Sequence, residues 1–210
     1  MEKEFWHEKW ESNEIGFHQD EAHPLLVNHF STLEVPADGR VFVPLCGKSR
    51  DMLCLRDMGY KVTGLELSEL AVKSFFSEND LEFDISQGED FRNYMANGLQ
   101  VLCGDFFKLT TRALENVDAV FDRASLVAMP PGMRPGYVNV FRSLLVSGCR
   151  ILLVVLEYED GLIKPPPFAI HQEEIMHLYA SWCRVEQIAK IDSEVKGQPC
   201  REVAYLLTVN

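Results

Sequence analysis

The stretch Val41-Phe42-Val43-Pro44-Leu45-Cys46-Gly47-Lys48-Ser49 decides the fold of this chain. Its first five residues are apolar and predict a short strand. Gly47 then permits a tight turn, because a residue without a side chain has few backbone restrictions. Apolar residues recur at helical spacing from Ser49 to Met58, and Gly59 is typical of a helix stop. The stretch therefore predicts a strand, a tight turn and a helix in succession.

The alternation of strands and helices continues along the chain. Seven strands are predicted, at residues 41–45, 60–67, 99–103, 117–122, 149–156, 185–191 and 202–209. Helices are predicted at residues 49–58, 68–78, 136–145 and 171–182. Ser68 is of a type that caps helices, and the run from Cys149 to Leu156 is apolar enough to be buried on both faces. Such an alternation requires a mainly parallel sheet covered by helices on both sides.

The last two predicted strands break this pattern. Only a short polar segment with Gly197 and Pro199 separates them, and a parallel return needs a longer crossover. They must therefore run antiparallel. The fold class predicted is α/β, with a doubly wound, mainly parallel seven-stranded sheet that ends in a C-terminal antiparallel hairpin. This Rossmann-like arrangement resembles the methyltransferase fold more than a dehydrogenase fold.

Composition and charge restrict the possible partners. The chain has 210 residues, 47% of them hydrophobic, which suits one domain with one continuous core. Twenty basic and thirty-two acidic residues give a net charge of −12. A surface this negative repels nucleic acid and anionic membranes, so a small ligand is favoured. No apolar run reaches the length of a membrane span, and the acidic start does not resemble a signal peptide.

The turn at Gly47 excludes two nucleotide-binding motifs. Gly47-Lys48-Ser49 matches the end of a P-loop, but Phe42 stands where that motif requires its first glycine. The dinucleotide fingerprint GxGxxG is also absent, because the loop has one glycine. A cofactor without phosphates, such as S-adenosylmethionine, suits the loop better, although a plain strand-to-helix turn is an alternative.

Ligands of open parallel sheets bind beyond the carboxyl ends of the strands. Glu66 ends the second predicted strand and is placed to accept both hydroxyls of a ribose; the alternative is a solvated acid. Gly104 and Asp105 follow the third strand, where the glycine would leave room for an adenine ring and Asp105 would accept from its amino group, unless it is a simple turn acid. Arg123 follows the fourth strand and would steady an anionic acceptor or the cofactor carboxylate; pairing with Asp122 or another acid is the alternative.

Other catalytic constellations are not found. His7-Glu8 has no second histidine at metalloprotease spacing, and Ser125 lacks the flanking glycines of a nucleophile elbow. We therefore predict no metal site, no hydrolase site and no catalytic acid or base. The cysteines lack CxxC spacing and are expected to be reduced core or loop residues, namely Cys46, Cys54, Cys103, Cys149, Cys183 and Cys200.

Several motifs together resemble the thiopurine S-methyltransferase family, in its short bacterial form, over nearly the whole chain. They are Trp6-His7-Glu8-Lys9-Trp10, Gly16-Phe17-His18-Gln19, Val43-Pro44-Leu45-Cys46-Gly47-Lys48, Gly64-Leu65-Glu66-Leu67-Ser68-Glu69-Leu70, Phe121-Asp122-Arg123-Ala124-Ser125-Leu126-Val127-Ala128, Pro165-Pro166-Pro167-Phe168 and Tyr205-Leu206-Leu207-Thr208. The Pro-Leu-Cys-Gly-Lys loop is unusual among methyltransferases generally and makes the resemblance specific.

The resemblance implies a single class I methyltransferase domain over residues 1–210 that uses S-adenosylmethionine. Residues 1–30 would form an N-terminal segment covering the cofactor, with Trp10 against it and Phe17 near the methyl acceptor. Leu45 would contact the cofactor through its backbone. The roles implied for four further residues match those argued from strand ends: Glu66, Gly104, Asp105 and Arg123. The C-terminal loop at 196–201 is shorter than in animal relatives, which puts its acceptor contacts in question.

The function expected is S-adenosylmethionine-dependent methyl transfer to the sulfur of thiopurines or related aromatic thiols, extending to selenium or tellurium species. We expect a cytoplasmic monomer, with metalloid detoxification as its role. Two other functions remain as alternatives. One is a non-catalytic S-adenosylmethionine-binding module, and the other is a small nicotinamide-dependent reductase, which the missing glycine fingerprint disfavours.

Overall fold

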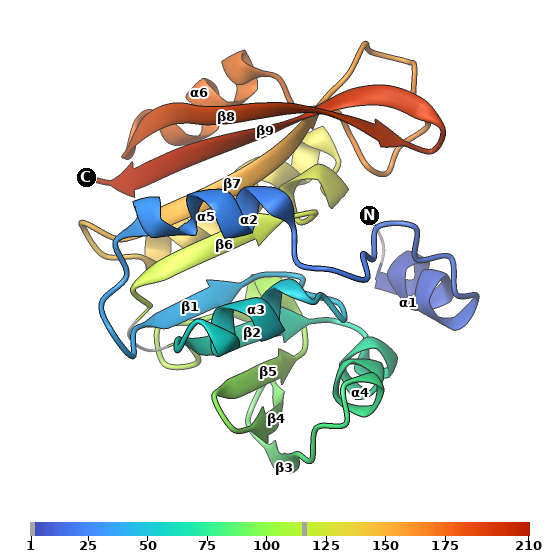
Figure 1. Ribbon diagram of the computed structural model, residues 1–210, viewed down its shortest axis with the longest axis vertical. Helices are drawn as coiled ribbons and strands as arrows, with labels where there is room; N and C mark the ends of the chain where they lie inside the picture. Colours follow the sequence, from blue (N-terminus) through green and yellow to red (C-terminus); the bar gives the residue numbers. More distant parts are fainter. Residues whose placement is uncertain (1–2, 115–116) are drawn as a thin grey trace.

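One nine-stranded sheet organises the computed structural model, which describes residues 3–114 and 117–210. Its strand order is β3-β4-β5-β2-β1-β6-β7-β9-β8 (Figure 1). The strands are β1 (Arg40–Val43), β2 (Lys61–Glu66), β3 (Asp84–Gln87), β4 (Arg92–Ala96), β5 (Leu99–Cys103), β6 (Ala119–Arg123), β7 (Arg150–Glu157), β8 (Cys183–Val195) and β9 (Gln198–Val209). The first two residues of the predicted covering segment lie outside the described residues.

Helices cover both faces of this sheet, as predicted. The helices are α1 (Lys3–Glu11), α2 (Pro24–His29), α3 (Asp51–Asp57), α4 (Glu69–Glu78), α5 (Arg134–Leu144) and α6 (Gln172–Tyr179). Short 3-10 turns are η1 (Phe30–Leu33), η2 (Phe106–Lys108), η3 (Leu126–Ala128) and η4 (Pro131–Met133). No helix in the described part of the chain is long and apolar enough to cross a membrane.

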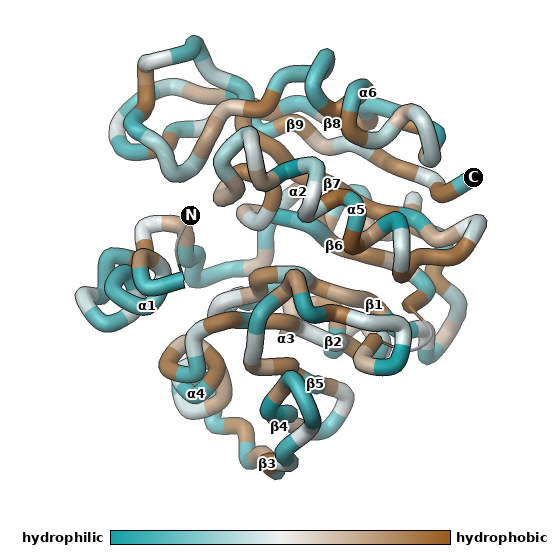
Figure 2. Tube along the Cα trace, turned by 180° about the vertical axis from the view of Figure 1, so that it is seen from behind, coloured by the Kyte–Doolittle hydropathy of each residue, from teal (hydrophilic) through white to brown (hydrophobic). Residues whose placement is uncertain are grey.

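Strand alternation divides the apolar core into two layers. Val41 and Val43 of β1 pack with α2, α3 and α4, whereas Phe42 faces α5 and α6. Figure 2 shows hydrophobic residues along the central strands and mainly hydrophilic ones in α1. The predicted segment 1–30 is thus divided, because Leu25 and Leu26 of α2 are buried in the core while α1 lies outside it.

The five central strands β5-β2-β1-β6-β7 are parallel, and β7-β9-β8 run antiparallel. The predicted fold class is therefore confirmed. The terminal hairpin turns at Lys196 and Gly197, whose φ angles of 52° and 72° are those of a tight two-residue turn. Both hairpin strands are longer than the 185–191 and 202–209 predicted, because polar residues that suggested a loop pair with one another as far as Val195 and Gln198.

The predicted count of seven strands is wrong. The additional strands β3 and β4 form an antiparallel hairpin that pairs with β5. All four residues of β3 are exposed, and in β4 only Tyr94 is buried, so neither strand has a clear apolar alternation. Pairing with the free edge of β5, rather than a local hydrophobic pattern, forms these strands.

Predicted helix ends are close to those observed, and Ser68 caps α4 by accepting from the Ala71 N–H at 3.4 Å. The last helix stops at Tyr179 instead of 182, since Trp182 turns back and donates its indole N–H to the Leu178 carbonyl. All six cysteines are free, as expected.

Candidate active site

The carboxyl ends of the parallel strands meet along one edge of the sheet. The chain runs from β1 outward to β2 and β5, then returns to β6 on the other side of β1. This reversal is the topological switch point at which open α/β sheets bind ligands. Figure 1 shows α1 on the side toward which β1, β2 and β6 point. The predicted site residues on the strand ends therefore share one edge.

The loop after β1 has an unusual backbone. Leu45 adopts a φ of 42°, in the left-handed region that non-glycine residues seldom occupy, and Gly47 has a φ of 51°. Strain of this kind gathers at functional sites. A Cβ on Gly47 would lie 3.0 Å from Cζ2 of Trp10. A glycine is therefore needed for the Trp10 ring to lie against this loop.

Glu66 at the end of β2 faces the same loop. Its carboxylate accepts from the Gly47 N–H at 2.9 Å and from the Ser68 N–H at 2.7 Å. Burial raises the pKa of the Glu66 carboxyl, and the two backbone donors oppose that rise. With 6% of its surface exposed, Glu66 is not the solvated acid of the alternative reading.

Gly104 and Asp105 lie beyond β5. A Cβ on Gly104 would lie 2.6 Å from the Phe91 ring, so close packing supplies a reason for this glycine besides room for a ligand. Asp105 accepts from the Phe107 N–H at 3.0 Å and forms an ion pair with Lys3 of α1 at 2.7 Å. The contact with the Phe107 N–H is that of a turn acid, as in the alternative interpretation. The ion pair shows that the same carboxylate also contacts the N-terminal helix.

Arg123 at the end of β6 pairs with an acid, but not with Asp122. Its Nη1 donates to Asp51 at 3.4 Å, and its side chain is 13% exposed. Asp122 points to the other face, where it accepts from the Tyr137 hydroxyl at 2.8 Å. The Ser125 hydroxyl donates to the Pro44 carbonyl at 2.8 Å and ties the loop after β6 to the loop after β1.

Aromatic residues of the N-terminal segment lie over this edge. Trp6 and Trp10 both contact Phe17 edge-to-face, with ring centroids 6.0 and 5.5 Å apart, so they share one face of α1 as predicted. Trp10 is buried, while Phe17 keeps 37% of its surface exposed. The ion pair between Lys3 and Asp105 holds the start of α1 near β5. Together these contacts place α1 across the ends of β1 and β5.

The cysteines and the lysine near the strand ends do not favour nucleophilic catalysis or phosphate binding. Burial raises the pKa of the Cys46 thiol well above its ordinary value and that of Cys103 to about 11, so neither supplies a thiolate near neutral pH. The Lys48 amine pairs with Glu78 at 2.8 Å, away from the position of a phosphate-binding lysine. Within residues 3–114 and 117–210, no three His, Cys, Asp or Glu side chains gather as potential metal ligands.

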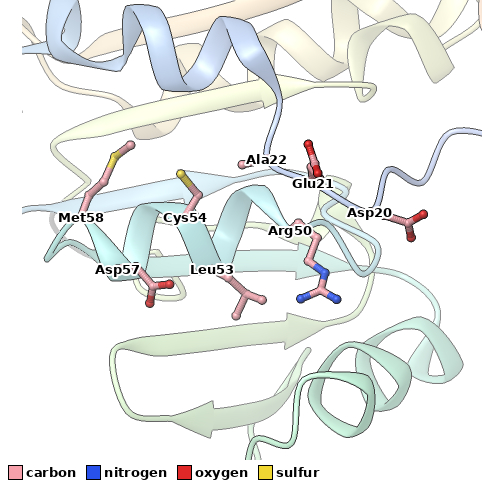
Figure 3. A pocket seen from close by; sticks show the side chains of 8 residues that line it. All are labelled: Asp20, Glu21, Ala22, Arg50, Leu53, Cys54, Asp57 and Met58. Atoms are coloured by element: carbon pink, nitrogen blue, oxygen red, sulfur yellow. The ribbon is translucent and has the colours of Figure 1, made fainter.

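Two grooves lie elsewhere on the molecule. One, of about 510 Å³, runs between residues 20–22 and α3 (Figure 3) and is lined by Asp20, Glu21, Ala22, Arg50, Leu53, Cys54, Asp57 and Met58. The other, of about 490 Å³, lies beside the loop after β7. Neither contains a predicted site residue. We assign the site to the strand ends, because the side chains and the loop geometry are found there.

Comparison with known proteins agrees with the geometry. The family model described as thiopurine S-methyltransferase matches residues 1–205. A thiopurine S-methyltransferase of Pseudomonas fluorescens is 45% identical over 192 residues, covering 91% of this chain and 88% of that protein. One from Nitrosospira multiformis is 46% identical, covering 91% and 87%.

The chain belongs to the thiopurine S-methyltransferase family. The resemblance read from its motifs is thereby confirmed, together with the prediction of an S-adenosylmethionine-dependent methyltransferase enzyme and of that cofactor. The reductase alternative is not supported.

Solved structures share the family fold at low identity. A 1,6-didemethyltoxoflavin-N1-methyltransferase of Burkholderia thailandensis, with bound S-adenosylhomocysteine, matches with a TM-score of 0.69 and 17% identity, covering 99% of this chain and 87% of that one. A TehB-like S-adenosylmethionine-dependent methyltransferase of Corynebacterium glutamicum matches with a TM-score of 0.58 and 11% identity, covering 99% and 98%. At these identities the likeness establishes the fold alone.

Two residues that contact the candidate site residues were missed from the sequence. Asp51 touches Arg123, and Lys3 touches Asp105, although neither was singled out. Asp51 had one usable signal, since it begins the helix that follows the glycine loop, where an acid is favourable. Lys3 had none, because its partner lies a hundred residues away in sequence and only the fold joins them.

Proposed function

We propose that this family member transfers the methyl group of S-adenosylmethionine to the sulfur of thiopurines or related aromatic thiols, and that selenium and tellurium species are further acceptors. The observation that carries the proposal is that the Gly47 loop beneath Trp10, the Glu66 carboxylate and Arg123 lie on adjacent strand ends at the switch point of the sheet. The names of the relatives support sulfur as the accepting atom.

The residues present fit the proposed cofactor. Glu66 is the carboxylate for the two ribose hydroxyls, and in this structure it uses both oxygens on backbone N–H groups of the surrounding loop. Asp105 is the acceptor for an adenine amino group, beside Gly104. Leu45 offers its backbone from the left-handed turn. This set contains no cluster of donors for a pyrophosphate, which agrees with a cofactor that has none.

The acceptor side of the site combines aromatic rings with one guanidinium. When bound, S-adenosylmethionine supplies a methyl group on a positively charged sulfur, which an electron-rich atom displaces in line. Trp10 and Phe17 pack edge-to-face. In this proposal the two rings exclude water from the reacting atoms. Their faces attract cationic groups. Arg123 favours the anionic form of the acceptor or holds the cofactor carboxylate.

This mechanism needs no general base from the protein. Burial raises the pKa of Asp122 to about 7, which would suit a base. However, Asp122 is completely buried on the opposite face and accepts from Tyr137, so it does not reach an acceptor. Aligning donor and acceptor can itself lower the barrier by about 7–11 kcal/mol. The thiol therefore loses its proton to solvent, and the enzyme aligns the resulting thiolate.

The proposal includes a monomeric state, a cytoplasmic location and a role in metalloid detoxification. Six unpaired cysteines support a reducing compartment. Light scattering coupled to gel filtration tests the monomer.

The deciding experiment is a panel of thiopurines, aromatic thiols, selenols and tellurite, each incubated with S-adenosylmethionine carrying a labelled methyl group. We expect the labelled methyl group to appear in the methylated product of at least the thiols. The Glu66→Ala variant should transfer less label than the wild type. Tight cofactor binding without transfer to any acceptor would favour the non-catalytic binding module instead.

A further inference from the structure

Asp51 is a buried carboxylate that joins three parts of the site. The first residue of α3, it has a side chain only 3% exposed. One oxygen accepts from the His23 N–H at 2.7 Å. The other accepts from the Ser49 hydroxyl at 2.9 Å and from Nη1 of Arg123 at 3.4 Å. These donors come from the segment before α2, the glycine loop and the end of β6.

A charge buried to this extent has to be compensated, and Arg123 supplies the opposite charge. The guanidinium carries further N–H donors, and in the described part of the chain these have no hydrogen-bond partner. Arg123 therefore donates to Asp51 through Nη1, and its other N–H groups remain for a ligand. Such an arrangement fixes the orientation of a long side chain, which is otherwise costly to order.

A second acid lies on the far side of the same cluster. Glu202 of β9 lies against Nε2 of the His23 ring and accepts from the Ser193 hydroxyl at 2.8 Å. Burial acts against ionisation, but the hydrogen bonds from His23 and Ser193 and the charge of Arg123 hold the pKa of Glu202 below its ordinary value. His23 thus engages Glu202 through its ring and Asp51 through its backbone, so the cluster is anchored to the sheet on both sides.

We propose that Asp51 is a positioning residue for Arg123, which it holds at one nitrogen so that the remaining donors face an anionic ligand. The inference rests on the proposed role of Arg123 in binding the cofactor carboxylate or an anionic acceptor. It adds that this role depends on a residue that touches neither ligand.

A double-mutant cycle tests the inference. The four proteins are the wild type, Asp51→Asn, Arg123→Ala and the double variant. Calorimetry gives the Kd of S-adenosylhomocysteine for each. Kinetics give the ratio of kcat/KM for 2-mercaptobenzoate to that for its neutral methyl ester. Arg123→Ala should weaken S-adenosylhomocysteine binding or lower the kcat/KM ratio, depending on which ligand Arg123 binds. We expect Asp51→Asn to change the same quantity in the same direction by roughly ten-fold. In the Arg123→Ala background the same change should have less than about a two-fold effect, because residues acting through one another are not additive.

Controls separate this inference from a general loss of structure. Asp122→Asn removes the neighbouring buried carboxylate on the other face and should leave both quantities unchanged. Asp51→Glu, which keeps the charge but displaces it, should show a smaller loss with the same non-additivity, and it replaces Asp51→Asn if that variant does not fold.

The possible failures are distinguishable. Equal, additive losses from Asp51→Asn in both backgrounds, or no loss in the wild-type background, would overturn the role of Asp51. If Arg123→Ala itself changes neither Kd nor the acceptor ratio, the proposed role of Arg123 is wrong, and the inference with it.

Discussion

Asp122 and Arg123 are consecutive residues of β6, and the strand sends their side chains to opposite faces. Asp122 lies in the core against Tyr137 of α5, and Arg123 lies against Asp51 of α3. Burial affects the two residues differently. Arg123 finds an opposite charge, whereas Asp122 has one oxygen, Oδ1, without a hydrogen-bond partner in the described part of the chain. One residue is thus suited to ligand binding, and the other is a cost to stability.

Glu66→Ala should weaken S-adenosylmethionine binding without unfolding the protein. Losing carboxylate hydrogen bonds to a ribose costs about 1.5–3 kcal/mol, or roughly ten- to a hundred-fold in Kd. Calorimetric titration of the variant measures this. The nearby Glu69, which is half-buried and pairs with Lys73 and Arg92, is changed to Gln as the control and should bind normally. An unchanged Kd for Glu66→Ala would remove Glu66 from the site.

Asp122→Asn should make stability less dependent on pH. The ordinary pKa of this carboxyl is 3.8, and burial raises it to about 7 in the folded protein. Because the folded pKa is the higher one, stability from Asp122 is fully present below about pH 4 and is lost as the pH rises to about 7. Each pH unit of this range lowers the free energy of unfolding by about 1.4 kcal/mol.

Asparagine keeps an acceptor for the Tyr137 hydroxyl and removes the charge. The gain in Tm of Asp122→Asn over the wild type should therefore grow between about pH 4 and about pH 7 and stay constant above. Thermal unfolding across this pH range provides the measurement. A Tm difference that does not vary with pH would show that Asp122 titrates normally.

Among the secondary-structure elements, α1 differs from the rest because it belongs to neither core layer. Its attachments include the Trp10 ring against the Gly47 loop, packing against α4, and the ion pair between Lys3 and Asp105. Its two tryptophans also contact Phe17 of the same segment. Exposed ion pairs contribute little. A helix held by so few contacts opens at low free energy, which suits a covering element.

Hydrogen exchange of residues 5–20 should slow when S-adenosylhomocysteine is added, because the ligand would extend the surface on which Trp10 packs. Exchange in α6, on the far side of the sheet, is the internal control and should not change. Gly47→Ala should diminish the protection, since its Cβ would lie 3.0 Å from the Trp10 ring at a φ of 51°. Equal protection of residues 5–20 with and without the ligand would rule out a covering role for α1.

At the scale of the whole molecule, a doubly covered sheet places its strand ends at one edge, and several ionisable side chains near that edge are buried or held by hydrogen bonds. Asp122 is buried, Glu66 is held by two N–H groups, and Cys46 and Cys103 stay protonated. Under the proposed mechanism, a protein arranged in this way would align the reactants without exchanging protons with them. Its rate should therefore follow the ionisation of the acceptor.

The rising limb of kcat/KM against pH should shift from one thiol to the next, in step with each thiol's own pKa. An enzyme base would instead impose one inflection on every acceptor. Profiles for several aromatic thiols of different acidity provide the test. Arg123→Ala should reduce kcat/KM more for anionic acceptors than for neutral ones, with the limbs still following the thiols. One inflection shared by all acceptors would contradict this mechanism.

The sequence by itself determined the alternating elements, the parallel direction of the central strands, the terminal hairpin and the family. These follow from local signals, such as the apolar run of β7, the Ser68 cap and the Gly47 turn. Strands and helices differ in the spacing of apolar residues, and that spacing can be recognised within a short stretch of sequence. The predicted site residues on the strand ends came from the same reasoning, since parallel strands carry their ends to one edge.

Tertiary structure alone decided the rest. It added β3 and β4, whose pairing depends on the open edge of β5, and it extended the terminal hairpin through polar residues. In the folded chain Arg123 pairs with Asp51 and not with Asp122, and Lys3 pairs with Asp105. Residues far apart in sequence can satisfy one another's charge only once the chain has folded, and many acids compete for each cation in a chain of net charge −12. Burial and geometry settle that competition, and neither is visible in neighbouring residues.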